Sequence, residues 1–321
     1  MMSRIHPSSS KKTAVLLLAH GSPDSVEDIP EFLLQVTRGR PVPSEVVEEI
    51  KHRYGLIGRS PLTEVTLRQG KLLSTELGLP VYVGMRNWKP FIADVVRTMA
   101  GDGIEHAVVI CLAPQNSRTS VGLYGSALGA TDKLPFSVDF VDSWHDHPLL
   151  IEAFAEKLKV GMASASQEFE QKIAVVFTAH SVPQRTIANG DPYQKQAEET
   201  AALVAAEASL ARDDWKFAFQ SQGMSGGPWL GPTVEETIRT LKTQGYGGIM
   251  VQPIGFLCDH VEVLFDIDIA FKKFADAEGL RLWRTESLND SPLLTAALAE
   301  ISRLRVSAAK KSASVPVRAI S

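Results

Sequence analysis

The chain has 321 residues, of which 44% are apolar and 22% charged, as in folded globular proteins and unlike disordered, collagen-like or coiled-coil chains. Its 33 lysine and arginine residues against 37 aspartate and glutamate residues give a net charge of −4, which argues against nucleic acid as a partner because nucleic-acid binding needs a basic surface. The two cysteines, Cys111 and Cys258, form no CxxC pair, so neither a zinc ribbon nor a cysteine-held iron–sulfur cluster is expected. We therefore expect a reducing, cytoplasmic compartment.

The chain lacks the apolar stretch of a membrane span. Its longest uninterrupted apolar run, residues 107–113, has seven residues, against the ~18 needed to cross a bilayer, so no integral membrane association is expected. Residues 1–12 and 307–321 are polar and basic and are predicted to be flexible tails. The run 14–19 lacks a cleavage site of signal-peptide type and is interpreted as a first buried strand.

Taken in chain order, short apolar runs alternate with longer amphipathic stretches. Strands are predicted at 13–19, 80–84, 106–112, 137–141, 172–178, 216–220 and 247–252, and helices at 44–54, 63–77, 90–100, 148–160, 192–210, 233–244 and 261–277. This alternation is typical of an α/β fold in which helices cover both faces of parallel sheets. Because ligands of such sheets bind at the carboxyl ends of the strands, the loops that follow the strands are the candidate sites.

An internal repeat relates the two halves of the chain. Ala14, Val15, Ala19, His20 and Pro23 recur at a constant offset of 160 as Ala174, Val175, Ala179, His180 and Pro183. The repeat predicts two similar, doubly wound (Rossmann-like) α/β halves, 13–150 and 151–305, that face each other across a cleft. His20 and His180 then lie at strand ends lining that cleft. The alternative is that each imidazole only hydrogen-bonds the backbone where its strand ends.

A pair of carboxylates marks the segment after the last predicted strand. Glu262 and Asp266 are four residues apart, so on a helix they share one face, and their neighbours are largely apolar. A carboxylate in such surroundings is paired, metal-bound or shifted toward its neutral form; a solvated acidic stripe is the alternative. Together with His20 and His180, this pair suits a divalent metal such as Fe²⁺, Co²⁺ or Zn²⁺.

A second cluster, early in the chain, is cationic. It contains Arg38, Arg40, Lys51, Arg53 and Arg59. Arginine is the usual residue for a bidentate grip on a carboxylate, although a solvated helix face also explains these charges. Trp229 lies in a loop rich in glycine and proline, and such loops often line a site.

Several familiar motifs are absent or incomplete. The sequence has neither a GxGxxG dinucleotide motif nor a P-loop. Residues 223–227 match GxSxG around Ser225, but Gly227 and Pro228 follow where a nucleophile elbow needs a helix. A serine hydrolase is therefore the weakest hypothesis.

The motifs taken together resemble the ferrochelatase family, whose members insert ferrous iron into a porphyrin. The resemblance rests on residues 178–183, 190–193, 228–232 and 255–264, and continues in 38–40, 60–62 and 81–85. It spans about 13–300, with the motifs in family order. It implies two chelatase-type α/β halves with parallel sheets around a porphyrin cleft, porphyrin and Fe²⁺ as substrates, and no permanently bound cofactor. We expect a monomer.

The resemblance also implies roles for single residues. His180 and Glu262 correspond to the family's catalytic histidine and its partner carboxylate at the metal, and His20 and Asp266 are further candidate metal ligands. The candidate porphyrin contacts are Arg53, Tyr54, Ser60, Tyr124, Arg38 and Trp229. If the two halves are related by a pseudo-twofold axis, His20 faces His180 across the porphyrin and is a candidate axial ligand of the product iron.

The substrate branch is indicated by two short segments. Residues 38–40 and 102–104 are similar to the soluble branch that metallates coproporphyrin III, and the branch acting on protoporphyrin IX is the next possibility. The chain departs from the first branch at His20, where a tyrosine is usual, at 86–87, where a Lys–His pair is usual, and at Ala270, where an acid is usual. A second metal-entry site is therefore not expected.

Two related functions stay open. One is a chelatase that inserts cobalt or nickel into another tetrapyrrole. The other is a non-catalytic haem- or porphyrin-binding relative, which we expect to have lost Glu262.

Overall fold

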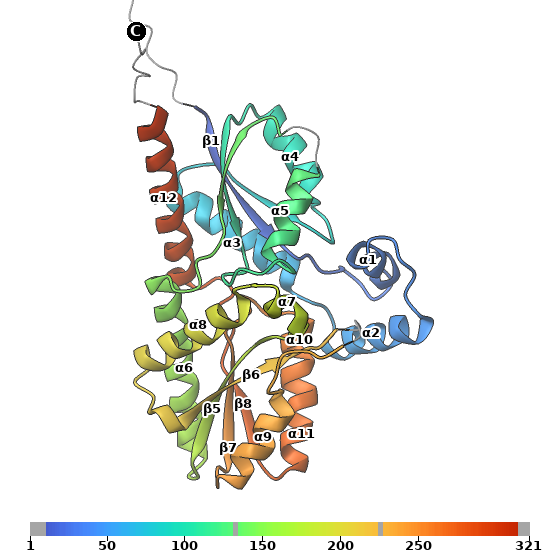
Figure 1. The fold of residues 1–321 in the computed structure, drawn as a ribbon, viewed down its shortest axis with the longest axis vertical. Helices are drawn as coiled ribbons and strands as arrows, with labels where there is room; N and C mark the ends of the chain where they lie inside the picture. Colours follow the sequence, from blue (N-terminus) through green and yellow to red (C-terminus); the bar gives the residue numbers. More distant parts are fainter. Residues whose placement is uncertain (1–10, 131–133, 224–226, 314–321) are drawn as a thin grey trace, which may run out of the picture.

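The two halves of the chain each build one parallel sheet. The computed structural model describes residues 11–130, 134–223 and 227–313. In the first sheet the strand order is β2-β1-β3-β4 and in the second β6-β5-β7-β8 (Figure 1). The strands are β1 (Thr13–Ala19), β2 (Val81–Met85), β3 (His106–Cys111), β4 (Ser137–Val141), β5 (Ile173–His180), β6 (Trp215–Gln220), β7 (Gly248–Pro253) and β8 (Arg281–Arg284). The predicted α/β fold with two parallel sheets is confirmed.

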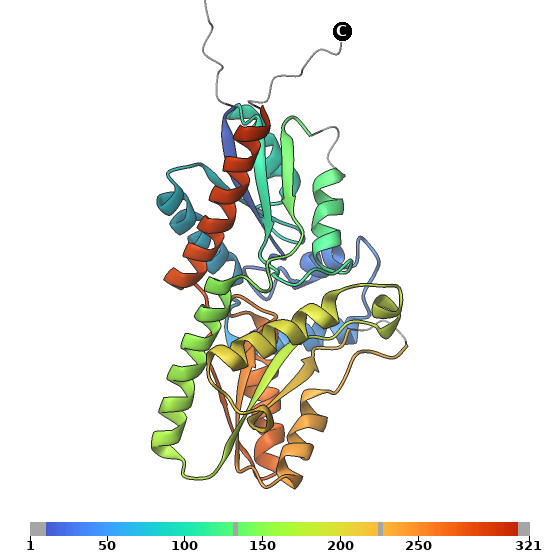
Figure 2. The same cartoon turned by 60° about the vertical axis from the view of Figure 1, so that its left-hand side comes forward.

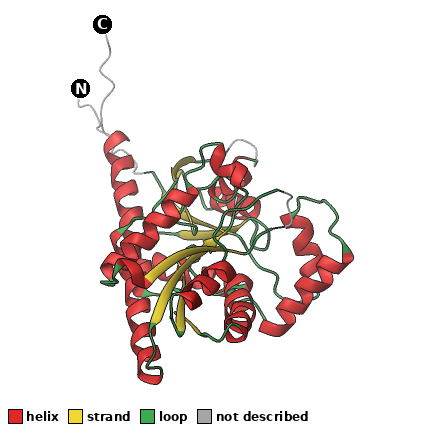
Figure 3. Ribbon diagram, turned by 60° about the horizontal axis from the view of Figure 1, so that its bottom comes forward, coloured by secondary structure: helices red, strands yellow, loops and turns green. Residues whose placement is uncertain are grey.

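Helices connect the strands and cover both faces of each sheet (Figure 3). They are α1 (Ile29–Val36), α2 (Ser44–Ile57), α3 (Leu62–Leu77), α4 (Ile92–Gly101), α5 (Val121–Gly129), α6 (Pro148–Glu168), α7 (Gln184–Ala188), α8 (Tyr193–Glu207), α9 (Val234–Thr243), α10 (Val261–Leu264), α11 (Lys272–Ala277) and α12 (Pro292–Ala313). None of the helices in the described part of the chain is both long and apolar enough to span a bilayer.

The internal repeat appears in the structure as a repeated strand order. β1 and β5, which carry the repeated sequence, occupy the same place in their sheets. Alternate residues of β1 enter different cores: Val15 and Leu17 pack on the side of α3 and α6, and Leu16 and Leu18 pack against α4. The side chains alternate because successive strand residues point to opposite faces. His20 and His180 therefore come to equivalent ends of equivalent strands.

One hydrophobic core continues from the first half into the second. It contains Val15 of β1 and Phe177 of β5, joined through α6 and α12. Figure 2 shows α12 and α6 following one another along one side of the molecule. Helix α12 packs against both α3 and α6, and the predicted division at residue 150 falls inside α6.

The predicted C-terminal tail differs from the structure over its first residues. Helix α12 continues to Ala313, whereas the tail was expected to begin at 307, because the alanines after Val306 favour helix. At the other end, Lys12 bonds to the turn before β3: its backbone N–H donates to the Glu105 carboxylate at 2.9 Å. Residues 1–10 and 314–321, which make up the rest of the two predicted tails, lie outside the described residues.

The helix predicted at 261–277 consists of three segments. After α10, residues 266–271 form a wide π-helical turn, in which the Ala270 N–H donates to the Phe265 carbonyl at 3.0 Å, and α11 follows. Wide turns of this kind are found frequently at functional sites. Asp266 is the first residue of this turn, and Glu262 lies just before it on α10, which follows the loop after β7.

Candidate active site

A cavity of about 460 Å³ opens at the carboxyl ends of the strands, between the two halves. Its wall takes residues from the loops after β1, β2, β3, β5 and β7, and from α1, α2, α3 and α8. They include His20, Tyr54, Gln69, Arg86, Ser120, Tyr124, His180, Tyr193, His260 and Glu262. Most of the remaining lining is apolar, which suits a large flat ligand with a few polar groups.

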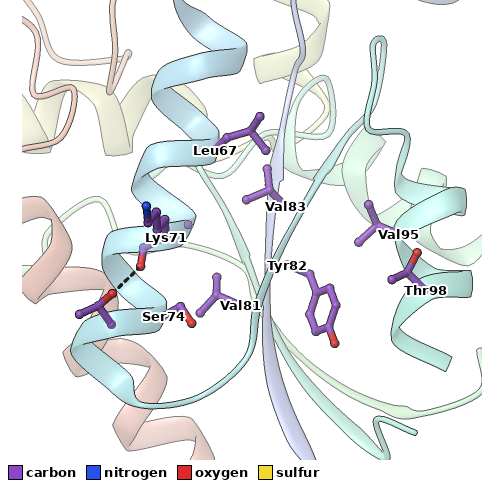
Figure 4. A pocket seen from close by; sticks show the side chains of 10 residues that line it. Leu67, Lys71, Ser74, Val81, Tyr82, Val83, Val95 and Thr98 are labelled. Atoms are coloured by element: carbon purple, nitrogen blue, oxygen red, sulfur yellow. Dashed lines mark hydrogen bonds between the residues drawn. The ribbon is translucent and has the colours of Figure 1, made fainter. Parts of the chain in front are cut away.

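A second hollow, of about 500 Å³, lies over the edge strand β2 between α3 and α4 (Figure 4). Its wall contains Leu67, Lys71, Tyr82 and Val95 but neither an imidazole nor a carboxylate. The Tyr82 hydroxyl is already used, since it donates to Asp102 at 2.6 Å. Because the lining of this hollow contains neither of the two groups expected at the site, imidazole and carboxylate, the first cavity is the candidate active site.

His180 is held at the end of β5 with one ring nitrogen facing the cavity. Its Nδ1 lies within hydrogen-bond distance of the Ser181 carbonyl, which can only accept, so Nδ1 carries the proton. The Tyr193 hydroxyl donates to the His180 carbonyl at 2.9 Å and fixes the backbone. The ring therefore directs its Nε2 atom toward Glu262, one carboxylate oxygen of which lies 3.7 Å away.

One carboxylate oxygen of Glu262, the one that lies near His180 Nε2, has no hydrogen-bond partner among the described residues. This oxygen, Oε2, has almost no solvent contact. His260 Nδ1 donates to the Cys258 carbonyl at 3.1 Å, and its Nε2 lies 4.0 Å from the same Glu262 oxygen. The ring nitrogens of His180 and His260 thus both lie within 4.0 Å of one unpartnered Glu262 oxygen, and a buried carboxylate oxygen without a partner attracts a cation or a proton.

His260 is a residue that sequence reasoning missed, although it was part of the motif around Glu262. Its position two residues before Glu262, in the loop that enters α10, is the signal that could have found it. Burial is the main cause that lowers the pKa of His260, so its ring remains a neutral acceptor near neutral pH.

His20 repeats the geometry of His180 but meets a different partner. Its Nδ1 donates to the Gly21 carbonyl at 3.0 Å, and its Nε2 lies 2.9 Å from the Asn87 side-chain amide nitrogen, which donates to it. The ring lines the cavity, and burial together with the Arg86 charge lowers the pKa of His20 to about 4. His20 is thus neutral, and the lone pair of its Nε2 atom accepts the hydrogen bond from Asn87.

Asp266 lies close to the converging acceptors but is bonded elsewhere. Ser221 donates a short hydrogen bond to it, and Arg53 lies 3.6 Å away. Burial is the main cause that raises the pKa of Asp266 to about 6, and the Glu262 charge adds to it. Across the described ranges, no group of three or more His, Cys, Asp or Glu side chains is arranged to hold a metal ion.

Of the predicted porphyrin contacts, Tyr54 and Tyr124 line the cavity. Both are buried. The Tyr54 hydroxyl shares a 3.2 Å hydrogen bond with Ser22, and burial raises the pKa of Tyr54 to about 12. Burial also raises the pKa of Tyr124. Both phenols therefore remain protonated donors at neutral pH.

The other predicted contacts do not belong to the cavity wall. Arg53 pairs with Glu49 at 2.9 Å and lies 4.9 Å over the Phe265 ring. Ser60 is buried in the turn before α3, and Arg38 is exposed after α1 with a left-handed φ of 56°. Trp229 pairs with Pro183 across the loops that follow β5 and β6. Ser225 lies outside the described residues.

The family model for ferrochelatase matches residues 12–305 of this chain. The chain belongs to the ferrochelatase family. It is therefore a metal chelatase of haem biosynthesis, with porphyrin and iron as substrates.

Relatives of the ferrochelatase support this over nearly the whole chain. A ferrochelatase of Acidobacterium capsulatum is 54% identical, covering 91% of this chain and 94% of the relative. A coproporphyrin III ferrochelatase of a Geobacillus species is 38% identical, covering 92% and 98%. The solved structure of SirB from Bacillus subtilis with Fe³⁺ has a TM-score of 0.58 at 12% identity, covering 94% of this chain and 98% of that one, and shows that the fold is shared.

Proposed function

We propose that this ferrochelatase inserts Fe²⁺ into coproporphyrin III, with His180 and Glu262 as the metal-binding and proton-accepting pair. The observation that carries the proposal is the unpartnered Glu262 oxygen in the cavity wall, with the Nε2 atom of His180 at 3.7 Å and that of His260 at 4.0 Å. The choice of porphyrin is supported by the 38% identical relative, a coproporphyrin III ferrochelatase.

Metallation of a porphyrin removes two N–H protons and forms four bonds from nitrogen to the incoming Fe²⁺. Neutral imidazole can bind Fe²⁺ or accept a proton near neutral pH, and His180 offers its Nε2 lone pair for either step. The Glu262 carboxylate, one oxygen of which lies 3.7 Å from His180 Nε2, can likewise bind Fe²⁺ or accept a proton. The two protons that leave the ring pass to these acceptors and then to solvent.

His20 and His180, the two histidines of the repeat, are assigned different roles because their Nε2 atoms have different partners. The Nε2 atom of His20 accepts a hydrogen bond from Asn87, so His20 binds a metal only if that bond is given up. The Nε2 atom of His180 faces a carboxylate and has no such donor. We therefore assign the first contact with Fe²⁺ to His180 and Glu262, and leave to His20 the later role of a ligand to iron already in the ring.

The porphyrin assignment is tested by anaerobic steady-state assays with Fe²⁺ and each porphyrin in turn. We expect kcat/KM for coproporphyrin III to exceed that for protoporphyrin IX by at least ~10-fold, since a charge-assisted hydrogen bond to an additional substrate carboxylate contributes ~1.5–3 kcal/mol. A kcat/KM that is equal for the two porphyrins, or higher for protoporphyrin IX, contradicts the assignment.

A further inference from the structure

The loop that follows β3 belongs to the first half of the chain but is held by the second. Residues 115–120, which we call the wall loop, join β3 to α5. Four of them line the cavity, namely Gln115, Ser117, Thr119 and Ser120. Helix α8 of the second half lies at the boundary between the two halves (Figure 2). Its Gln196 accepts a hydrogen bond from the Asn116 N–H at 2.6 Å, and its Thr200 accepts one from the Gln115 side chain at 3.2 Å.

Asp191, two residues before α8, binds the wall loop and the helix with its two carboxylate oxygens. Oδ2 accepts the Arg118 N–H at 2.7 Å and the Ser117 hydroxyl at 3.2 Å, both from the wall loop. Oδ1 accepts the N–H of Tyr193, the first residue of α8, at 3.0 Å. Asp191 is 5% exposed, and donors to both oxygens beside a helix N-terminus stabilise a carboxylate that is buried so deeply. A single buried side chain thus joins the wall loop to α8.

Tyr193 continues this connection to the metal-binding pair. Its hydroxyl donates to the His180 carbonyl at 2.9 Å, and its buried side chain lines the cavity. Hydrogen bonds therefore lead from the wall loop through Asp191 and Tyr193 to the backbone that carries the His180 ring. Asp191 itself does not line the cavity, so it acts through these neighbours and not on the substrate.

We propose that Asp191 is a positioning residue for metallation, which fixes the wall loop of the first half relative to His180 of the second. The proposal rests on the proposed function, because that function gives His180 the contact with Fe²⁺. The wall loop contacts the molecule that fills the cavity, whereas the metal-binding pair belongs to the second half. Insertion brings the ring nitrogens to the ion, and a displacement of ~1 Å between reacting groups is enough to lower a rate severely.

The first test is the steady-state kinetics of Fe²⁺ insertion into coproporphyrin III by Asp191→Ala, Asp191→Asn and the wild type. In Asp191→Ala we expect kcat to fall at least ~10-fold, because the wall loop shifts relative to His180. KM for the porphyrin is expected to change less than ~3-fold, because the apolar lining of the cavity is intact. Asp191→Asn keeps the side-chain volume and one acceptor oxygen, so it tests the proposal if Asp191→Ala does not fold, and its kcat is expected to fall at least ~3-fold. An unchanged kcat, or a loss carried by KM alone, overturns the proposal.

Glu198→Ala is the matched control for these kinetics. Glu198 is an exposed acid of the same helix, and it accepts a hydrogen bond from Gln194, one turn earlier, at 2.9 Å. The variant is expected to keep the wild-type kcat and KM. A loss of kcat equal to that of Asp191→Ala would show that any lost acid on α8 has this effect, and would overturn the proposal.

Digestion with trypsin, without porphyrin or iron, separates positioning of the wall loop from a general loss of stability. Arg118 is exposed, and its backbone N–H is one that Asp191 holds. Cleavage follows the population of the locally open form, so Asp191→Ala is expected to be cut after Arg118 at least ~10-fold faster than the wild type. Cleavage after Arg97, an exposed residue of α4, is expected to keep its rate. Equal acceleration at both arginines, or none at Arg118, overturns the proposal, whereas a wild type that metallates no porphyrin contradicts the proposed function alone.

Discussion

The histidines at the ends of β1 and β5 show how one local geometry serves two purposes. In both, Nδ1 donates to the carbonyl of the next residue, Gly21 or Ser181, so Nε2 is the ring nitrogen that meets a second partner. What differs is the partner that faces Nε2, which is the Asn87 amide for His20 and the Glu262 carboxylate for His180. The Asn87 amide donates to the Nε2 atom of His20. The Glu262 carboxylate that faces the Nε2 atom of His180 cannot donate when it is ionised, so this nitrogen stays accessible to a metal or a proton.

Asp266 allows a test of the electrostatics beside this pair. Its carboxyl has a pKa of about 6 in the folded chain, above the ~3.9 of an unperturbed aspartate, so the folded state holds the proton more tightly and loses stability as pH rises from about 4 to 6. We expect Asp266→Asn to be more stable than the wild type at pH 8, by on the order of 2 kcal/mol, and equally stable at pH 3.5. Urea unfolding at both pH values measures this difference.

The matched control for this prediction is Asp276→Asn, because Asp276 is an exposed residue of α11. Its unfolding free energy is expected to follow that of the wild type at both pH values. If Asp266→Asn gains no stability at pH 8, the charged Asp266 is stabilised by Arg53 and Ser221 by more than burial costs it.

At the scale of elements, a buried arginine on β8 ties together the segments that carry the site. Arg284 makes two hydrogen bonds to Asp268 of the π-helical turn, at 2.7 and 2.9 Å, and a third to Asp259 at 3.2 Å. Asp259 directly precedes His260 and also accepts from Ser287 at 2.8 Å. The loop before α10 and the turn after it are thus held to the sheet from both ends, which orients Glu262 toward the cavity.

Removing this arginine leaves two carboxylates without their partner. We expect Arg284→Met to lower the free energy of unfolding by about 3 kcal/mol and to lower kcat for metallation at least ~10-fold, because a small displacement of Glu262 is costly to catalysis. Urea unfolding and initial rates measure the two effects.

Arg281→Met on the same strand is the control for Arg284→Met. The Arg281 side chain is 47% exposed and pairs with Glu168 at 2.8 Å, whereas that of Arg284 is 15% exposed. A surface pair of this kind contributes ~0–1 kcal/mol, so Arg281→Met is expected to keep its stability and its rate. Equal losses in the two variants would show that β8 acts only as a structural strand.

The sequence predicted most elements because buried parallel strands are continuous apolar runs. β3 and β7 were found within one residue at each end. β8 was missed because its two apolar residues are flanked by Arg281 and Arg284 and it lies at a sheet edge. Helix α5 was missed because it contains three glycines, which lower helix propensity.

The site could be predicted only where its residues follow a sequence pattern. His180 and Glu262 were found because one lies in the repeat and the other in a motif. His260 was missed although it lies in the same motif, because its importance comes from the Glu262 oxygen that its Nε2 atom meets at 4.0 Å. Which polar atoms remain unpartnered in the cavity wall depends on packing between distant segments, and no local pattern encodes it.

At the scale of the whole molecule, the last helix connects the two halves on which the cavity depends. Helix α12 packs against α3 of the first half and α6, which leads into the second. Arg303 of α12 pairs with Glu76 of α3 at 2.7 Å. Just before the helix, the Asn289 carbonyl accepts a hydrogen bond from Gln69, a residue of the cavity wall, at 2.5 Å. The shared core therefore sets how the two walls face each other.

Two leucines of α12 test this connection. Leu298 is 1% exposed and belongs to the core shared by both halves, whereas Leu304 is 64% exposed. We expect Leu298→Ala to lower the free energy of unfolding by about 3 kcal/mol and Leu304→Ala to leave it unchanged within ~0.5 kcal/mol. Urea unfolding compares the two. A similar loss for both variants would show that α12 is stabilised by its own helix propensity and not by the shared core.

The central claim is that His180 and Glu262 place Fe²⁺ in the porphyrin. The most direct measurement is the initial rate of anaerobic Fe²⁺ insertion into coproporphyrin III, followed by absorbance, for the wild type, His180→Ala and His52→Ala, an exposed histidine of α2. We predict that His180→Ala loses at least ~100-fold in rate while still binding the porphyrin, and that His52→Ala keeps the wild-type rate. A wild-type rate in His180→Ala would contradict the account.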